Sequence, residues 1–124
     1  MKVDIWAAGL IVFELATGVY CVPVKHHSER FVRNLSHFRS VATYIDKFPQ
    51  SMLSFSSKTE KYFTASGQPK GKKIKHVAFE TQLKESGWPA KDARELGEFL
   101  KQVLVVDYKQ RPSASEVLQM RYMN

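Results

Sequence analysis

The longest run of apolar residues lies near the start of the chain, at positions 5 to 24, and Glu14 is its single charged residue. About 20 apolar residues would also suit a membrane anchor. However, an ionised Glu14 near the centre of a bilayer would cost about 2.5–3.5 kcal/mol. A signal peptide fits poorly, because Lys2 is offset by Asp4 and no small-residue cleavage site follows. The pattern therefore favours a helix over residues 3–18, apolar on every side and buried at the centre of a soluble domain.

Both ends of this predicted helix carry residues that suit helix termini. Asp4 suits the N-terminus, where a carboxylate meets free backbone N–H groups and the positive end of the helix dipole. Gly18 suits the position just after the last helical residue. The next residues, 19–34, contain Pro23 and a charged, histidine-containing middle, and are expected to form a loop.

Apolar positions at helical spacing recur along the rest of the chain. A helix is predicted over residues 36–48, with Ser36 at its start and Pro49 as its stop. Residues 51–64 suit one or two short helical turns, and residues 77–86 a helix ended by Gly87. An amphipathic helix is predicted over 90–106, with this apolar stripe: Leu96, Phe99, Leu100, Val103 and Leu104.

The chain closes with a capping box, in which Ser113 and Glu116 occupy the first and last positions of S-x-x-E. A last helix is therefore expected from Ala114 to about Tyr122. With no strand pattern between these segments, the predicted fold class is all-α.

Length and composition indicate one ordinary globular unit. The chain has 124 residues, of which 44% are hydrophobic and 25% charged. Cys21 is the single cysteine, which excludes an internal disulfide and favours an intracellular protein of the cytoplasm, the nucleus or both. Because Cys21 lies in an apolar run, we expect a packed thiol rather than a reactive one.

The charge is basic, with 19 Lys and Arg against 12 Asp and Glu, a formal net charge of +7. The most basic segment is the loop at residues 65–76, with Lys70, Lys72, Lys73 and Lys75. Such a cluster suits an acidic partner or nuclear import, although a solvated surface loop is the simpler interpretation. Little aromatic interleaving accompanies it, so nucleic acid is not favoured. His26 and His27 are adjacent and no acid or cysteine converges on them, which argues for a solvated loop rather than a metal site.

Two motifs resemble those of a known family. D-I-W-A-A-G at residues 4–9, followed by E-L-A-T-G at 14–18, resembles the D-x-W-S-x-G…E-L-x-T-G segment of eukaryotic protein kinases. D-Y-K-Q-R-P-S-A-S-E-V-L at 107–118 is similar to their closing D-P-x-x-R-P-[ST]-A-x-E-x-L segment. Their order and separation match the C-terminal lobe of a kinase.

The middle of the chain narrows the resemblance to the SR-protein kinases. Y-F-T-x-x-G at 62–67 and E-S-G-W-P-A-K-D-A-R-E-L-G-E-F-L at 85–100 are similar to segments that occur there in the same order. The resemblance covers residues 3–122, and only the last half or less of a kinase domain. Residues 1–124 would then be a partial kinase domain, with residues 3–18 as its central hydrophobic helix.

The resemblance implies structural roles for four residues. Asp4 would bond backbone groups of the catalytic loop and hold it in place, and Trp6 would pack beneath the activation segment. Gly9 is the glycine of the same motif. Arg111 would pair with the glutamate of the A-P-E motif. These partners are not among the 124 residues.

The resemblance also implies a parent activity, the ATP-dependent phosphorylation of protein serines with magnesium. The chain contains no G-x-G-x-x-G, H-R-D, D-F-G or A-P-E motif, so it holds no catalytic, cofactor or metal residues of that reaction. We therefore expect the chain alone to be inactive, with a protein substrate or the missing N-terminal part of the kinase as its partner. The alternatives are a non-catalytic interaction module and, less favoured, a small basic membrane-associated protein.

Two features depart from the family pattern. Ala7 replaces the usual serine after Trp6. SR-protein kinases also dock arginine-rich substrates on an acidic groove, built partly by the helix that matches residues 36–48. Here that segment carries Arg39 and Lys47 against Asp46. An arginine-rich docking peptide would therefore meet little attraction from this segment.

Overall fold

The structure is a computed structural model, and it describes residues 2–23, 27–54 and 59–123. These residues form helices joined by loops, which confirms the all-α prediction, and their strand-like pairing is limited to one isolated bridge between Phe63 and Pro69. The helices are α1 (Lys2–Thr17), α2 (Arg30–Tyr44), α3 (Gln50–Leu53), α4 (Thr59–Tyr62), α5 (Phe79–Glu85), α6 (Ala90–Val103), α7 (Ala114–Leu118) and the 3-10 turn η1 (Arg121–Met123).

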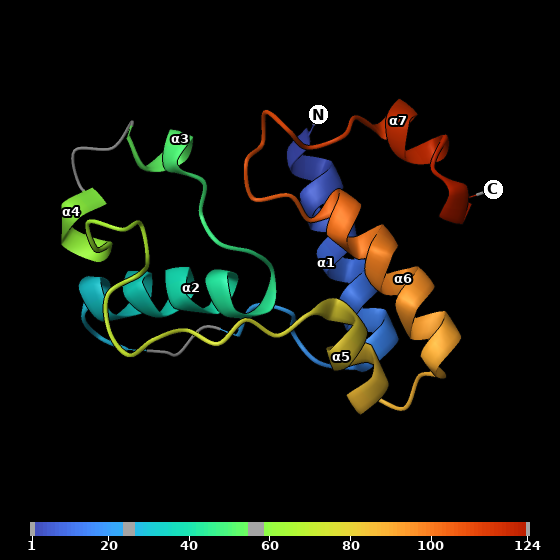
Figure 1. Cartoon of the computed structure of the whole chain (residues 1–124), viewed down its shortest axis with the longest axis horizontal. Helices are drawn as coiled ribbons and strands as arrows, with labels where there is room; N and C mark the ends of the chain where they lie inside the picture. The colour runs from blue at the N-terminus through green and yellow to red at the C-terminus, as the bar shows by residue number, and fades with distance from the viewer. Residues whose placement is uncertain (1, 24–26, 55–58, 124) are drawn as a thin grey trace.

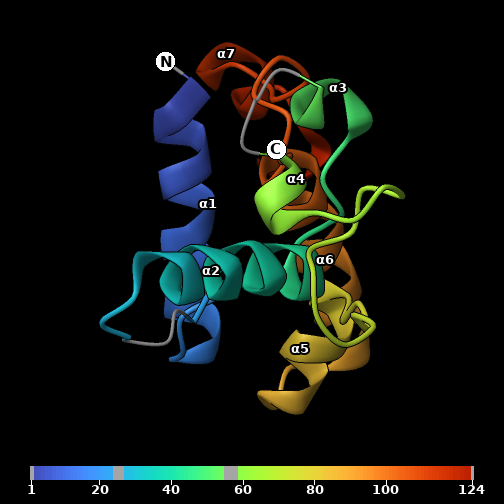
Figure 2. The ribbon, with the colours of Figure 1, turned by 90° about the vertical axis from the view of Figure 1, so that its left-hand side faces the viewer.

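The helices form two groups (Figure 1). One group contains α1, α5, α6 and α7, so the first and last helices of the chain belong to the same group. The other group contains α2, α3 and α4, and α2 runs crosswise to α1 (Figure 2). The two groups are joined at the C-terminal end of α2, where the Val77 N–H donates to the Thr43 carbonyl at 2.8 Å.

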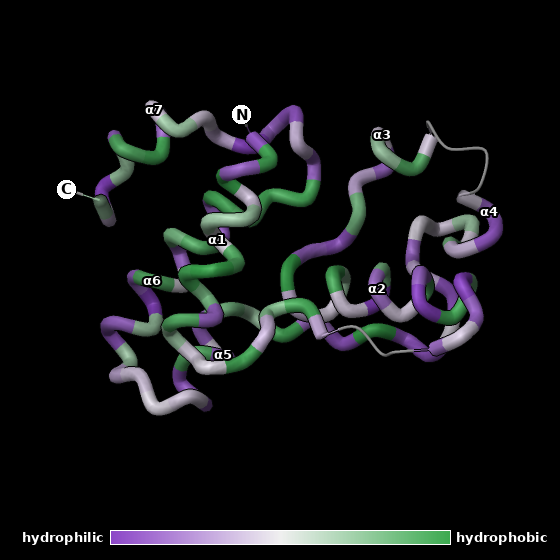
Figure 3. The backbone as a smooth tube through the Cα atoms, turned by 180° about the vertical axis from the view of Figure 1, so that it is seen from behind, coloured by the Kyte–Doolittle hydropathy of each residue, from purple (hydrophilic) through white to green (hydrophobic). Residues whose placement is uncertain are grey.

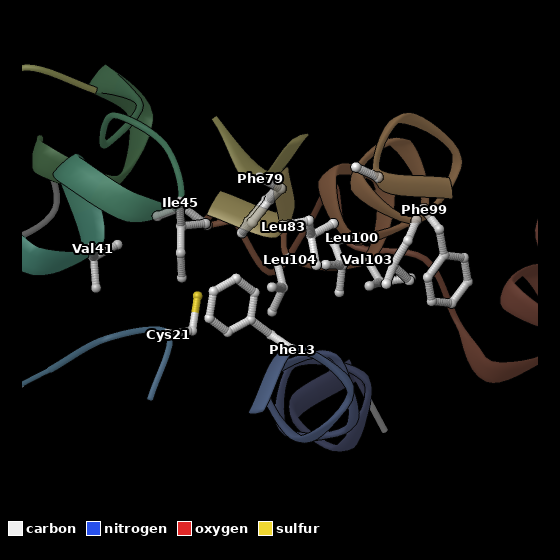
Figure 4. Close-up of a cluster of buried hydrophobic side chains, with 13 residues drawn as sticks. Phe13, Cys21, Val41, Ile45, Phe79, Leu83, Phe99, Leu100, Val103 and Leu104 are labelled. Atoms are coloured by element: carbon white, nitrogen blue, oxygen red, sulfur yellow. The ribbon is translucent and has the colours of Figure 1, made fainter. Parts of the chain in front are cut away.

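The main hydrophobic cluster lies between α1, α5 and α6. Phe13 points from α1 toward Phe79 of α5, and the two rings meet edge to face with centroids 6.2 Å apart (Figure 4). The predicted stripe of α6 is buried in full: Leu96, Phe99, Leu100, Val103 and Leu104. Each such apolar side chain contributes about 1.5–3 kcal/mol when it leaves water. Val41 and Ile45 of α2 extend the cluster into the second group.

Helix α1 forms where the sequence predicts it, but it is not buried on every side. Val3, Ile11 and Leu15 are 68%, 55% and 82% exposed. The helix is largely hydrophobic along its length (Figure 3), yet α5 and α6 cover one side of it only. The expectation of a fully buried central helix is therefore wrong for these 124 residues, and the uncovered side is an apolar surface that we call the α1 outer face.

Helix α1 ends as its sequence predicts. Gly18 has φ +77°, a left-handed conformation that glycine adopts without steric cost, and its N–H donates to the Glu14 carbonyl at 2.7 Å. Asp4 lies in the first turn, where its negative charge interacts favourably with the positive end of the helix dipole.

Helix α2 differs from the prediction at both ends, since it begins at Arg30 rather than Ser36 and ends at Tyr44 rather than near Phe48. The extra turns bring Phe31 and Leu35 against a second cluster around Tyr62 and Phe63. This tertiary packing outweighs the polar residues that suggested a loop. Pro49 stands instead just before α3.

The C-terminal elements follow the prediction closely at their starts. In the capping box, the Glu116 N–H donates to Ser113 Oγ and the Ser113 N–H donates to Glu116 Oε1. The Ser113 N–H, which donates to the Glu116 carboxylate, holds the pKa of Glu116 below its usual value, and the Ser113 side chain lowers this pKa further. Helix α7 ends at Leu118, so the helix predicted to Tyr122 is shorter, and η1 takes the remainder.

Candidate functional site

The residues at the two ends of the chain that carry the kinase resemblance meet at one corner of the structure, which we call the Arg111 corner. Trp6 comes from the first half of α1, and Arg111 from the loop before α7. The Arg111 guanidinium lies over the Trp6 ring, 4.7 Å from its centroid. Stacking of this kind contributes about 0.5–2 kcal/mol, depending on how far the cation is withdrawn from water.

Arg111 is 8% exposed, and three backbone carbonyls accept from its guanidinium. Nε donates to Val105 O at 2.9 Å, and Nη2 to Val106 O at 3.2 Å. Nη1 reaches across to Lys2 O at 3.2 Å, so one side chain joins the loop after α6 to the first residue of α1. Burial lowers the pKa of Arg111, and nearby Asp107 partly offsets this effect.

A buried cation is usually stabilised by a carboxylate. For Arg111, three backbone carbonyl dipoles and the face of the Trp6 ring provide this stabilisation instead. The ion pair between Lys84 and Glu80, at 3.4 Å, lies elsewhere in the structure. The glutamate that the resemblance implies for Arg111 is absent from the 124 residues. Its pairing with Arg111 therefore stays a prediction.

Asp4 lies on the same end of α1 but not in the Arg111 corner. Its side chain is exposed, and none of the described residues forms a hydrogen bond or an ion pair with it. A carboxylate fixed on a rigid helix in this way is available to backbone N–H groups of another segment. Its implied role toward a catalytic loop stays a prediction.

Gly9 sets how closely α1 approaches α6. A Cβ atom at this position would lie 2.9 Å from Leu104 Cδ2 and 3.2 Å from Val103 Cγ2. The absence of a side chain at Gly9 thus lets α1 lie close to the end of α6, and a larger residue would force Leu104 to move. This contact gives the motif glycine a packing role at the centre of the main cluster.

Trp88 is a structural residue whose role the sequence alone does not indicate. Its Nε1 donates to the Ala16 carbonyl at 2.8 Å, which ties the connection between α5 and α6 to the last turn of α1. The only signal in the sequence was a tryptophan before proline at the start of a helix. The partner lies 72 residues away, so nothing local could identify it.

Cys21 is buried, with 2% of its surface exposed. Burial, with a smaller contribution from Glu14, raises the pKa of its thiol from 9.0 to about 12. A thiol of this kind stays protonated at neutral pH and is a poor nucleophile. The prediction of a packed thiol is confirmed, and its low reactivity stays a prediction.

Of the two adjacent histidines, His27 lies within the part of the chain that the structure describes. His27 is exposed, and its Nδ1 accepts from the Glu29 N–H at 3.1 Å. His26 lies outside the described residues. No group of three His, Cys, Asp or Glu side chains among the described residues could hold a metal ion.

The basic loop is fastened to α2. Arg39 donates through Nη1 to the Lys70 carbonyl at 2.9 Å and through Nη2 to the Lys72 carbonyl at 2.8 Å. Gly71 lies between these carbonyls with φ +115°, and a Cβ there would lie 2.8 Å from Arg39 Nη1. Lys70, Lys72, Lys73 and Lys75 are all exposed. Arg39 therefore holds the backbone of the loop and leaves its ammonium groups in solvent.

Within the described residues, none of the helices has both the length and the apolar character needed to cross a membrane. Helix α1, the segment that raised this alternative, has 16 residues.

The sequence model of the family "Protein kinase domain" matches residues 1–123 of this chain. The chain therefore belongs to this family. Relatives within it are SR-protein kinases. A "Serine/threonine-protein kinase SRPK" of Physarum polycephalum is 28% identical over 98% of this chain and 29% of its own length. "SRSF protein kinase 3" of Homo sapiens is 25% identical over 98% of this chain and 22% of its own length. "Serine/threonine-protein kinase spk-1" of Caenorhabditis elegans is 23% identical over 97% of this chain and 12% of its own length.

The predicted resemblance to the SR-protein kinases is therefore confirmed over nearly the whole chain, at low identity. The chain spans less than a third of the length of these curated relatives.

Proposed function

We propose that these 124 residues are the C-terminal helical part of a serine/threonine kinase domain, and that they support phosphoryl transfer without performing it alone. The observation that carries this proposal is the Arg111 corner. There a buried arginine joins the two kinase motifs through Lys2 O and the Trp6 ring. ATP, magnesium and the serine-containing protein substrate would be bound by an intact parent kinase, inside the cell.

The α1 outer face is the surface that we assign to the missing part of the kinase domain. Its three large side chains, Val3, Ile11 and Leu15, are between 55% and 82% exposed on a rigid helix. An apolar surface of this kind is typical of a contact with another part of a protein. Asp4 lies on the same helix with its carboxylate exposed, as holding a catalytic loop would require.

The test is a chimera, in which residues 1–123 replace the matching segment of the Physarum polycephalum kinase. The assay measures transfer of labelled phosphate from ATP to a peptide that the recipient kinase phosphorylates. We expect the chimera to be active, and the isolated chain to give no more transfer than a mock purification. A folded chimera without activity would refute the assignment. Activity of the isolated chain that persists through repurification would refute the proposal that it is inactive alone.

Asp4→Asn provides a control that separates folding from function. Because Asp4 is exposed, the substitution should change the stability of the isolated chain by less than about 0.5 kcal/mol. In the chimera it should lower kcat at least tenfold, since a carboxylate that orients the catalytic loop would be lost. Equal activity of both chimeras would exclude this role.

A second candidate is a non-catalytic interaction module, and the distribution of charge favours it. Residues 19–78 carry 11 Lys and Arg against 3 Asp and Glu, whereas the rest of the chain carries 8 against 9. The whole positive excess thus belongs to the segment that contains α2, α3 and α4. A charge concentrated in this way favours an acidic partner. Binding of such a partner by the isolated chain would support this candidate.

A further inference from the structure

A groove opens between α2, α3 and α4, in the positively charged part of the molecule. Its volume is about 450 Å³, which is within the usual range of ligand pockets. Its floor is apolar and includes Phe38, Phe48, Met52 and Leu53. We call it the α2–α4 groove.

The floor of this groove is rigid, because its aromatic rings pack on one another. The Phe38 ring lies 5.2 Å from both the Tyr62 and the Phe63 rings, between centroids. Asn34 Nδ2 donates to the Tyr62 hydroxyl at 3.1 Å and fixes that ring further. Tyr62 and Phe63 are each 7% exposed, so their faces are already covered by protein. Tyr62 and Phe63 therefore offer no free ring face on which a nucleic-acid base could stack, whereas the groove itself can accept an apolar side chain.

Cations, and no acids, line the groove. Arg30 of α2 and Lys61 of α4 contribute to its wall, and none of the lining residues is acidic. The Lys61 ammonium lies 5.6 Å from the Phe31 ring centroid and 5.7 Å from that of Tyr62, which keeps it beside the aromatic floor. An occupant therefore meets apolar surface below and positive charge beside it.

The basic loop adds to the positive potential of the same part of the molecule. Because Arg39 already fastens this loop to α2, ordering its backbone costs little when a partner arrives. Its exposed lysines would raise the rate of association with an acidic partner. The described acids of residues 27–76 are only Glu29, Asp46 and Glu60.

We propose that the α2–α4 groove binds an acidic protein segment, which inserts an aliphatic or aromatic side chain into the groove and directs flanking carboxylates to Arg30 and Lys61. This inference deepens the second candidate function and requires no phosphoryl transfer. It also applies if the chain works within a longer kinase, in which case the groove would select an acidic substrate or regulator. The charge of the groove is opposite to what an arginine-rich segment would need.

The test measures fluorescence anisotropy of labelled probes titrated with the full 124-residue chain. The first probe is a short peptide with a Leu-Phe pair between runs of Asp and Glu. The second has Ala-Ala in place of that pair, and the third has Lys in place of every acid. A single-stranded DNA oligonucleotide of equal charge is the fourth. We expect the first probe to bind at least tenfold tighter than each of the others.

Charge-reversal variants locate the binding surface. Arg30→Glu with Lys61→Glu should weaken binding of the first peptide at least tenfold, since both cations of the groove become repulsive. Lys91→Glu is a single charge-reversal control on α6, where the side chain is exposed and remote in the fold, and it should change binding less than twofold. Circular dichroism melting of each variant confirms that the fold is retained.

Other outcomes would overturn the proposal. Equal binding of the Ala-Ala peptide or of DNA would show that only net charge is recognised. No binding of the first peptide, or equal loss with Lys91→Glu, would exclude the groove as its site. Concentration-dependent dimers that the first peptide fails to dissociate would assign the groove to a second copy of the chain. None of these outcomes bears on the chimera experiment, so the two proposals fail independently.

Discussion

Replacing Arg111 by methionine tests how strongly one side chain holds the two ends of the chain together. Methionine keeps much of the aliphatic contact with Trp6 but removes three donors, so the carbonyls of Lys2, Val105 and Val106 lose their partners. Each hydrogen bond from a charged donor contributes about 1.5–3 kcal/mol, and the cation–ring contact about 0.5–2 kcal/mol.

These values are not simply additive, because the substitution also removes the desolvation cost of a buried cation and lets water reach part of the corner. We therefore expect the free energy of unfolding to fall by about 2–4 kcal/mol. For a chain of this size, each kcal/mol corresponds to about 4 °C in Tm. The expected decrease in Tm is thus about 8–16 °C.

The assay is urea denaturation followed by circular dichroism and by tryptophan fluorescence. Arg94→Met is the matched control, because Arg94 is an exposed arginine on α6. The control should change the free energy of unfolding by less than about 0.5 kcal/mol. If Arg111→Met shifts the urea midpoint no more than the control does, the three hydrogen bonds do not stabilise the fold and the reasoning is refuted.

The surroundings of Gly9, Trp88 and Cys21 each lead to a further prediction. Gly9→Ala places a methyl group 2.9 Å from Leu104 Cδ2 and should cost about 1–3 kcal/mol in urea denaturation; an unchanged midpoint would show that α1 and α6 separate freely. Trp88→Phe removes the hydrogen bond to the Ala16 carbonyl and should cost about 1 kcal/mol, with faster hydrogen exchange of the last turn of α1 as its specific signature. Cys21 has a thiol pKa raised to about 12 in the folded chain, so its neutral form favours folding. The contribution of the neutral thiol to the free energy of unfolding is complete below pH 9, the ordinary pKa of a thiol. It is lost as the pH rises toward 12, by up to about 1.4 kcal/mol per pH unit. The difference in stability between the wild type and Cys21→Ala should therefore change over this interval, and a constant difference would contradict the burial of the thiol.

Local patterns in the sequence predicted the elements whose determinants are local. The apolar stripe of α6 and the reciprocal bonds of Ser113 and Glu116 lie within a few residues of one another, and both are observed. The start of α2 was missed because Phe31 packs against Tyr62, a contact between segments 31 residues apart. The periodicity of apolar residues does not predict contacts between residues so far apart in the chain.

The candidate site divides in the same way. Trp6 and Arg111 were selected by resemblance, and the structure places them in contact. Their actual partners could not be predicted, because Lys2 O lies 109 residues from Arg111 and is a backbone atom with no sequence signature. The sequence also did not predict that Leu15 is exposed. An apolar residue suggests burial, but it does not identify the segment that would bury it.

The distance along the chain between α1 and α6 has a consequence for synthesis. Gly9 packs against Leu104, so α1 leaves the ribosome about 95 residues before the side chain that covers it. At about 5–20 residues per second, this interval lasts roughly 5–20 seconds. During that time Ile5, Leu10 and Phe13 lack the main hydrophobic cluster that covers them in the folded chain. A nascent chain of this kind is a substrate for chaperones that bind apolar helices, and its yield in cells should depend on their supply more than on its final stability.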